Sequence, residues 1–182
     1  MREASGRYLL ALGPHDPPVE EAFTCGPQGD GWCWRATRRD PVTGAGLGRL
    51  VLEVGAGGSV RLHAEHGGWT LRGGEVGGAV LWRRGDEEHE TVADGFAGSS
   101  PGLAAATVSR LRGQGVAVGE SRRLRLVEVT EPVLATRTVD TSWTRTAGDR
   151  WRVVDLATGT GRDLALQDGL VVAGTGLTLT RA

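Results

Sequence analysis

The sequence predicts a mainly β fold of the α+β kind, in which an antiparallel β-roll or open barrel carries one α-helix near residues 100–112. Short runs of alternating apolar and polar residues recur along the chain, and this period of two is typical of half-buried strands. Thirty glycines separate these runs, and one segment changes to a helical period. Because 182 residues can form one β domain with a sizeable core, we expect a single domain over residues 1–182.

The clearest strands lie in the first half of the chain. Residues 32–37 alternate with a period of two, which places Trp32 and Trp34 on one face. This tryptophan face is expected to point inward. Residues 50–54 and 60–65 show the same alternation on either side of a glycine-rich turn, and such a pair of runs predicts a hairpin.

Proline and serine mark the segments that interrupt the strands. Three prolines between residues 14 and 18 predict a loop over residues 13–30 that is free to move, because proline cannot donate to a sheet ladder. Ser100 is a good N-cap, and Pro101 suits the first position of the predicted helix. The resulting order of strands, one helix and strands argues against a parallel doubly wound sheet.

Charge and hydropathy exclude several kinds of partner. The formal net charge is −1 and the pI is about 6.4, so the chain lacks the positive field that binds phosphate backbones. We expect no nucleic acid partner. The sequence contains no run of about 18 apolar residues, and its first apolar run is too short for a secretory signal. These features predict a cytoplasmic protein without an integral membrane segment, in which Cys25 and Cys33 stay reduced.

The best match to a catalytic motif is Gly-Ser-Ser-Pro-Gly at residues 98–102, which has the form G-x-S-x-G. The oxyanion hole of that motif needs the backbone N–H of the residue after the nucleophile, and Pro101 has none. The serine is therefore interpreted as a helix cap. His63 and His66 fall on opposite faces of one predicted strand, and local spacing supplies no third ligand. Neither a metal nor a cofactor is expected.

The tryptophans and the scarcity of other large side chains predict a ligand. Core packing accounts for most of the six tryptophans, but the chain has only two phenylalanines, one tyrosine and one methionine. Small residues lining a wide roll would leave a cavity, and cavities in β-barrels are typical sites for apolar or amphiphilic molecules. We expect a lipid-like ligand and no covalent chemistry. The apolar part is assigned to three tryptophans and an anionic or sugar head group to three arginines: Trp82, Trp143 and Trp151, and Arg84, Arg125 and Arg145.

Short motifs in the C-terminal half carry a family resemblance. They read VAVGES at 116–121, RLRLV at 123–127, SWTR at 142–145, DRWR at 149–152 and DGLVV at 168–172. Over about residues 100–182 the chain resembles the bacterial glycolipid-binding domain family. The resemblance implies a spiral β-roll of the kind seen in lipoprotein carriers. It also implies an internal apolar groove and a lipid ligand such as a glycolipid.

Two other functions stay open at this point. One is a small β-barrel enzyme of the cyclase or isomerase type, acting on an apolar metabolite, with His63, Glu65 and His89 as its acid–base candidates. Convergence of these three side chains in one apolar cavity would favour it. The other is a scaffold protein whose unpaired sheet edge accepts a peptide or another strand.

Overall fold

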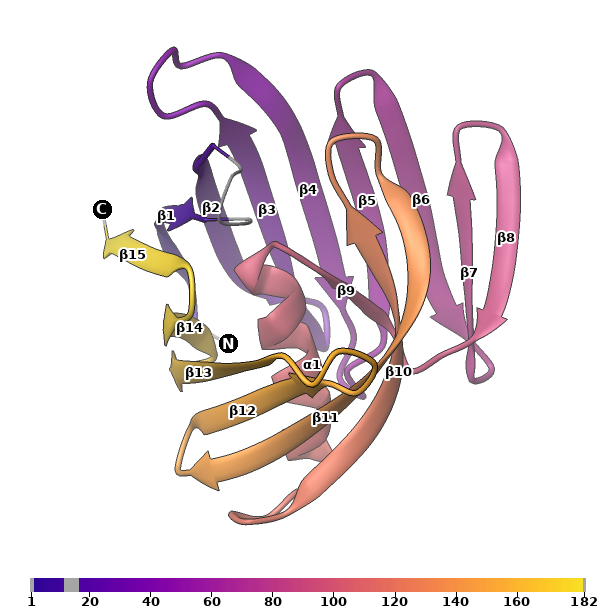
Figure 1. Cartoon of the computed structure of the whole chain (residues 1–182), viewed down its shortest axis with the longest axis vertical. Helices are drawn as coiled ribbons and strands as arrows, with labels where there is room; N and C mark the ends of the chain where they lie inside the picture. Colours follow the sequence, from indigo (N-terminus) through magenta and orange to yellow (C-terminus); the bar gives the residue numbers. More distant parts are fainter. Residues whose placement is uncertain (1, 12–16, 182) are drawn as a thin grey trace.

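The computed structural model describes residues 2–11 and 17–181. Within these residues the chain forms one sheet of 15 strands that curls around one helix. Figure 1 shows the strands arranged as an open roll with the helix between its two halves. The predicted mainly β class is confirmed, and the sheet is not closed into a barrel. The elements are β1 (Ala4–Leu10), β2 (Val19–Gln28), β3 (Gly31–Arg39), β4 (Gly46–Val54), β5 (Val60–His66), β6 (Trp69–Val76), β7 (Ala79–Arg84), β8 (Glu87–Val92), β9 (Phe96–Gly98), α1 (Pro101–Gly113), β10 (Ser121–Thr130), β11 (Ala135–Ala147), β12 (Arg150–Asp155), β13 (Gly161–Gln167), β14 (Leu170–Gly174) and β15 (Leu177–Arg181).

Two antiparallel meanders make up the sheet. Consecutive strands pair from β1 through β8 and again from β10 through β15. Strand β1 pairs with β15, and this pair joins the two meanders. Among the described strands only β9 and β10 pair in parallel, with α1 as their connection. The sheet edges are therefore β8 and β9, which are neighbours in the sequence.

The link between these two edges is bonded to the second meander. The backbone N–H of Asp94 donates to the carbonyl of Arg125 at 2.6 Å, and the Asp94 carboxylate accepts from the Arg125 N–H at 2.8 Å. Because this link is short, the two edges of the sheet are held near one another and the roll stays curled.

The predicted loop over residues 13–30 is corrected by the structure, because β2 occupies its second half from Val19 to Gln28. Alternate residues of β2 are buried on the inner face, as the pattern of a half-buried strand requires. Pro27 is tolerated in this strand because the pairing of β1 with β2 ends at Cys25, which leaves the β1 side of Pro27 without a ladder. Residues 12–16 of the predicted loop lie outside the described residues.

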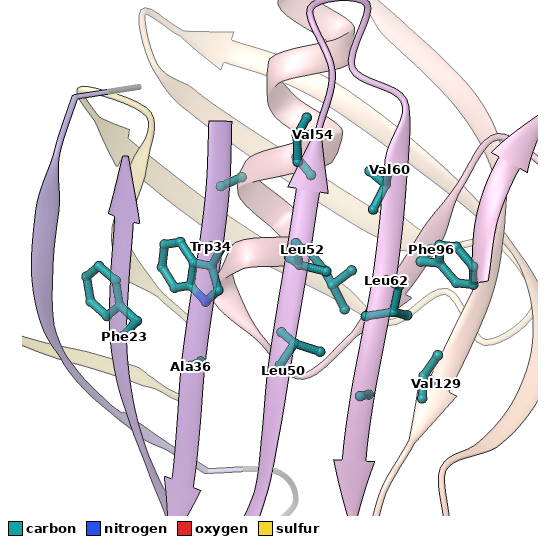
Figure 2. Packing of buried hydrophobic residues seen from close by; sticks show 14 of the residues in the cluster. Phe23, Trp34, Ala36, Leu50, Leu52, Val54, Val60, Leu62, Phe96 and Val129 are labelled. Carbon is teal, nitrogen blue, oxygen red and sulfur yellow. The ribbon is translucent and has the colours of Figure 1, made fainter. Parts of the chain in front are cut away.

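The inward tryptophan face and the β4–β5 hairpin are confirmed. Trp32 and Trp34 are buried in the first core, and the Phe23 and Trp34 rings stack at 4.3 Å with an angle of 2° between their planes. Leu52 of β4 pairs directly with Leu62 of β5. Figure 2 shows Phe23, Trp34, Leu52 and Leu62 projecting from β2 to β5 into one layer, with α1 behind them.

Helix α1 fills the centre of the roll. Ser100 caps it, since the Ser100 hydroxyl accepts the N–H of Gly102 at 3.3 Å. Residues 101–108 are buried without interruption, as in a helix that has no solvent face. Leu103 packs into the first core and Val108 into a second core against the other meander. The wide hollow expected from the small inward residues is therefore occupied by this helix.

Contact between α1 and β3 predicts a large difference between two glycines of the helix. A Cβ on Gly102 would lie 2.9 Å from three ring atoms of Trp34, whereas a Cβ on Gly113 would meet nothing within 4 Å. Gly102→Ala is expected to lower the free energy of unfolding by about 1–3 kcal/mol through overpacking. Gly113→Ala, the matched control, should raise it by up to about 1 kcal/mol. Urea denaturation measures both, and an equal response of the two variants would contradict the close packing of α1 on Trp34.

Candidate functional site

A group of polar side chains lies inside the roll, among apolar neighbours. We call it the Arg38 cluster, and its members come from β2, β3, β5, the start of α1 and the β10–β11 turn: Glu21, Arg38, His66, Ser99, Ser100 and Glu131. Glu21 is 0% exposed and Arg38 is 4% exposed. Charged side chains are rarely so buried unless they are paired, so these two residues mark a specialised part of the interior.

Strand register brings Arg38 to Glu21. The two residues are direct partners in the pairing of β2 with β3, and both occupy inward positions. The Nε and Nη2 atoms of Arg38 donate to Oε2 of Glu21 at 2.9 and 2.7 Å. The hydroxyl of Ser100 donates to Oε1 of Glu21 at 2.8 Å. Both oxygens of the buried Glu21 carboxylate therefore accept hydrogen bonds.

The third nitrogen of Arg38 faces the other meander. Its Nη1 donates to the hydroxyl of Ser99 at 3.0 Å and forms an ion pair with Oε1 of Glu131. All three guanidinium nitrogens are thus engaged. Because Glu131 follows β10, this ion pair ties the first meander to the second.

His66 and Glu131 form the less complete side of the cluster. Nδ1 of His66 lies 3.5 Å from Oε2 of Glu131, and neither atom has a hydrogen-bond partner within residues 2–11 and 17–181. Burial lowers the pKa of His66, and the positive charge of Arg38 lowers it further. The imidazole is therefore neutral at pH 7.

A small cavity adjoins the Arg38 cluster. Its volume is about 20 Å³, which is enough for about one water molecule. Arg38, Ser99, Ser100 and Glu131 supply its polar lining. The apolar lining comes from both meanders and from α1: Leu50, Leu62, Ala64, Leu103, Val129 and Leu134. Leu50, Leu62 and Val129 are labelled in Figure 2. Charged and apolar groups thus line the same cavity.

The turn at residues 131–134 covers this cavity. Leu134 from the turn is buried and lines the cavity together with Glu131. Arg84 of β7 donates from Nε and Nη2 to the carbonyl of Val133 at 3.0 and 2.9 Å. In Figure 1 the tip of the β10–β11 hairpin accordingly lies near the end of β5 and the start of β6. The second meander closes the cavity through this turn.

A larger concavity lies between the turns at residues 29–30 and 55–59. Its volume is about 450 Å³, and its lining includes Asp30, Glu53 and Arg61. Asp30 and Arg61 are exposed and Glu53 is partly exposed, so water can solvate these charges. The smaller cavity is the better candidate site, because buried charges meet an apolar wall there.

The structure does not gather the three predicted tryptophans in one place. Trp143 and Trp151 are buried in the second core, where Nε1 of Trp143 donates to the Thr141 hydroxyl at 3.1 Å. Trp82 packs against the first core and stacks on His89 at 5.2 Å. None of the three lines either of the two cavities described above.

The predicted arginines are engaged elsewhere on the protein. Arg125 is exposed and pairs with Asp140 at 3.0 Å. Arg145 donates to the carbonyls of Val116 and Gly148 at 3.0 and 2.7 Å. Among the predicted binding residues, Arg84 contacts the turn that covers the small cavity, because it donates to the carbonyl of Val133.

The three acid–base candidates do not meet in a cavity, and His89 lies apart from the other two. His63 and Glu65 project from the outer face of β5, with Nε2 of His63 3.2 Å from Oε1 of Glu65. His89 lies on the edge strand β8 and pairs with Trp82. Their convergence in one apolar cavity, which would have favoured an enzyme, is not present.

Of the Arg38 cluster, Ser100 was predicted as a helix cap and His66 was considered as a metal ligand and rejected. The other members were missed. A usable signal was present, because Arg38 continues the inward positions of Trp34 and Ala36, and His66 continues those of Leu62 and Ala64. A charged residue at an inward position of a strand needs a buried partner. Glu21 supplies that partner for Arg38, but it lies in the segment predicted as a loop.

Comparisons with known proteins bear on the fold. No family model matches the sequence, and no curated protein matches it. A crystal structure of a DUF1089 family protein from Pseudomonas aeruginosa is similar over 95% of this chain and 91% of that chain, with a TM-score of 0.52 and 18% identity. At this identity the likeness shows a shared mainly β fold. None of the helical segments within the described ranges is long and apolar enough to span a membrane.

Proposed function

We propose that this protein binds an amphiphilic, lipid-like small molecule at the Arg38 cluster, without covalent chemistry. The observation that carries the proposal is the cavity in which a buried charged network and an apolar wall meet. Such a lining suits a ligand with a polar end and an apolar body. The resemblance of residues 100–182 to glycolipid-binding domains supports the same class of ligand.

Binding requires the turn at residues 131–134 to move. The cavity holds about one water molecule, so a larger guest must displace the side chain of Leu134. The contacts that hold the turn are the Arg38–Glu131 ion pair and the Arg84 hydrogen bonds to Val133. Loss of the Arg84 hydrogen bonds lets Leu134 move out and exposes the apolar wall without breaking a strand, while Glu131 stays paired with Arg38. Among the residues predicted from the sequence, Arg84 then acts at the entrance.

A cavity-filling substitution tests this site. Ala64→Leu places a larger side chain in the cavity wall and is expected to weaken the binding of a dodecyl-chain amphiphile by about tenfold or more, a factor that corresponds to about 1.4 kcal/mol. Ala36→Leu is the control, because Ala36 is equally buried but does not line the cavity. Tryptophan fluorescence and native mass spectrometry measure binding, and thermal unfolding shows whether both variants are folded.

Two results would contradict the proposal in different ways. If the unaltered protein binds no dodecyl amphiphile, the proposed function is wrong. If Ala64→Leu binds as tightly as the unaltered protein, the ligand lies elsewhere.

A further inference from the structure

We infer that the polar end of the ligand is cationic, an ammonium group on an aliphatic chain, and that it binds between Glu131 and His66. This inference rests on the proposed function and specifies its ligand. It differs from the anionic or sugar head group expected from the sequence, because the arginine of this site is already paired.

Formal charge supports a cation. Two carboxylates, Glu21 and Glu131, face one guanidinium, that of Arg38, and His66 is neutral, so the Arg38 cluster carries one uncompensated negative charge. Glu21 is well compensated, because Arg38 donates to it twice and Ser100 connects it to the positive N-terminal end of α1. The missing positive charge therefore belongs beside Glu131.

Hydrogen-bonding capacity points to the same place. Nε and Nη2 of Arg38 are used by Glu21, and Nη1 is used by Ser99 and Glu131, so a phosphate or carboxylate would have to displace an existing partner. In contrast, Oε2 of Glu131 and Nδ1 of His66 have no hydrogen-bond partner in the described part of the chain. His66 is only 9% exposed, so bulk water does little to satisfy its nitrogen.

The geometry suits a single donor group that contacts both atoms from one side. They lie 3.5 Å apart, and one nitrogen can lie about 2.9 Å from each of them. An ammonium group has three N–H donors and can bond to both atoms at once when the neutral imidazole carries its proton on Nε2, which leaves Nδ1 as an acceptor. A hydroxyl group has one donor and leaves the excess negative charge of the Arg38 cluster uncompensated. The site therefore favours an amine over a neutral alcohol or sugar, and both over an anion.

Three dodecyl ligands that differ only in the polar group test this order. Dodecylamine, dodecyl maltoside and dodecanoate are titrated below their micelle concentrations at pH 7, and binding is measured by calorimetry and native mass spectrometry. Dodecylamine is expected to bind about tenfold or more tightly than the maltoside, a factor that corresponds to about 1.4 kcal/mol. Dodecanoate is expected to bind most weakly.

Glu131→Gln is the decisive variant, because it keeps the shape of the side chain and removes its charge. It is expected to abolish the preference for the amine while the maltoside still binds. Glu128→Gln, which removes a carboxylate paired with Arg137 on the surface, serves as the control. Should Glu131→Gln fail to fold, His66→Leu removes the second acceptor and should reduce amine binding several-fold.

The outcomes separate the two proposals. Binding of none of the three ligands would contradict the proposed function itself. Binding of the maltoside or dodecanoate as tightly as the amine, or an amine preference that survives in Glu131→Gln, would contradict the cationic ligand and leave the amphiphile site in place.

Discussion

Replacement of Arg38 by methionine is expected to lower the free energy of unfolding by about 3–5 kcal/mol, the usual cost of removing one partner of a buried ion pair. Arg38→Met retains the apolar stem but leaves the Glu21 carboxylate, which is 0% exposed, with the Ser100 hydroxyl as its remaining donor. It also releases Glu131 and so loosens the turn over the cavity. Urea denaturation followed by tryptophan fluorescence measures the change.

Two further variants show whether the loss comes from an uncompensated charge. Arg49→Met breaks an exposed pair with Glu65 and should cost less than about 1 kcal/mol. The double variant Glu21→Leu, Arg38→Met removes both buried charges and should recover part of the stability. Recovery stays incomplete because Glu131 still lacks its partner. A loss below about 1 kcal/mol in Arg38→Met would mean that water reaches Glu21 and that the cluster is not a closed network.

The predicted strands and turns that the structure confirms are those specified by a pattern of neighbouring residues. The hairpin predicted from residues 50–54 and 60–65 is formed by β4 and β5, because the buried apolar residues of each run keep one phase and the glycines lie between the runs. The Asp168-Gly169 turn has φ values of 53° and 87°, and this dipeptide favours such hairpin turns. Signals of this kind act over a few residues, so one sequence is enough to find them.

The missed elements depend on partners that are distant in the sequence. Strand β9 has three residues and pairs with β10 only after α1 has crossed between them. Helix α1 was predicted, but its place inside the roll was not. The composition of the helix indicates this buried position, because residues 103–106 are leucine and alanine and leave no polar face.

The candidate site could not be assembled from the sequence for the same reason. Once Val19–Gln28 is read as a loop, Glu21 has no inward position and Arg38 has no partner across the strands. Glu131 comes from the other meander and reaches Arg38 only when the roll has formed. Three large tryptophans were assigned to the ligand, but Trp143 and Trp151 are buried in the second core and Trp82 packs against the first.

Trp34→Ala is expected to lower the free energy of unfolding by about 3–5 kcal/mol, as truncation of a large core side chain does. Trp34 is 0% exposed and stacks on Phe23, with Tyr8 at 6.2 Å between ring centroids. Gly102 of α1 lies against its ring. Its removal therefore leaves a void where the sheet and the helix meet, and thermal unfolding with urea denaturation measures the loss.

Trp69→Ala provides the matched control, because it deletes the same side chain at a site that is 41% exposed, under the guanidinium of Arg84. Its cost should be below about 1 kcal/mol, the strength of an exposed cation–π contact. Trp34→Phe should retain part of the stability by keeping an aromatic ring beside Phe23. Equal losses in Trp34→Ala and Trp69→Ala would show that α1 does not press on β3, and the roll would then have room for a guest without any movement of the turn at residues 131–134.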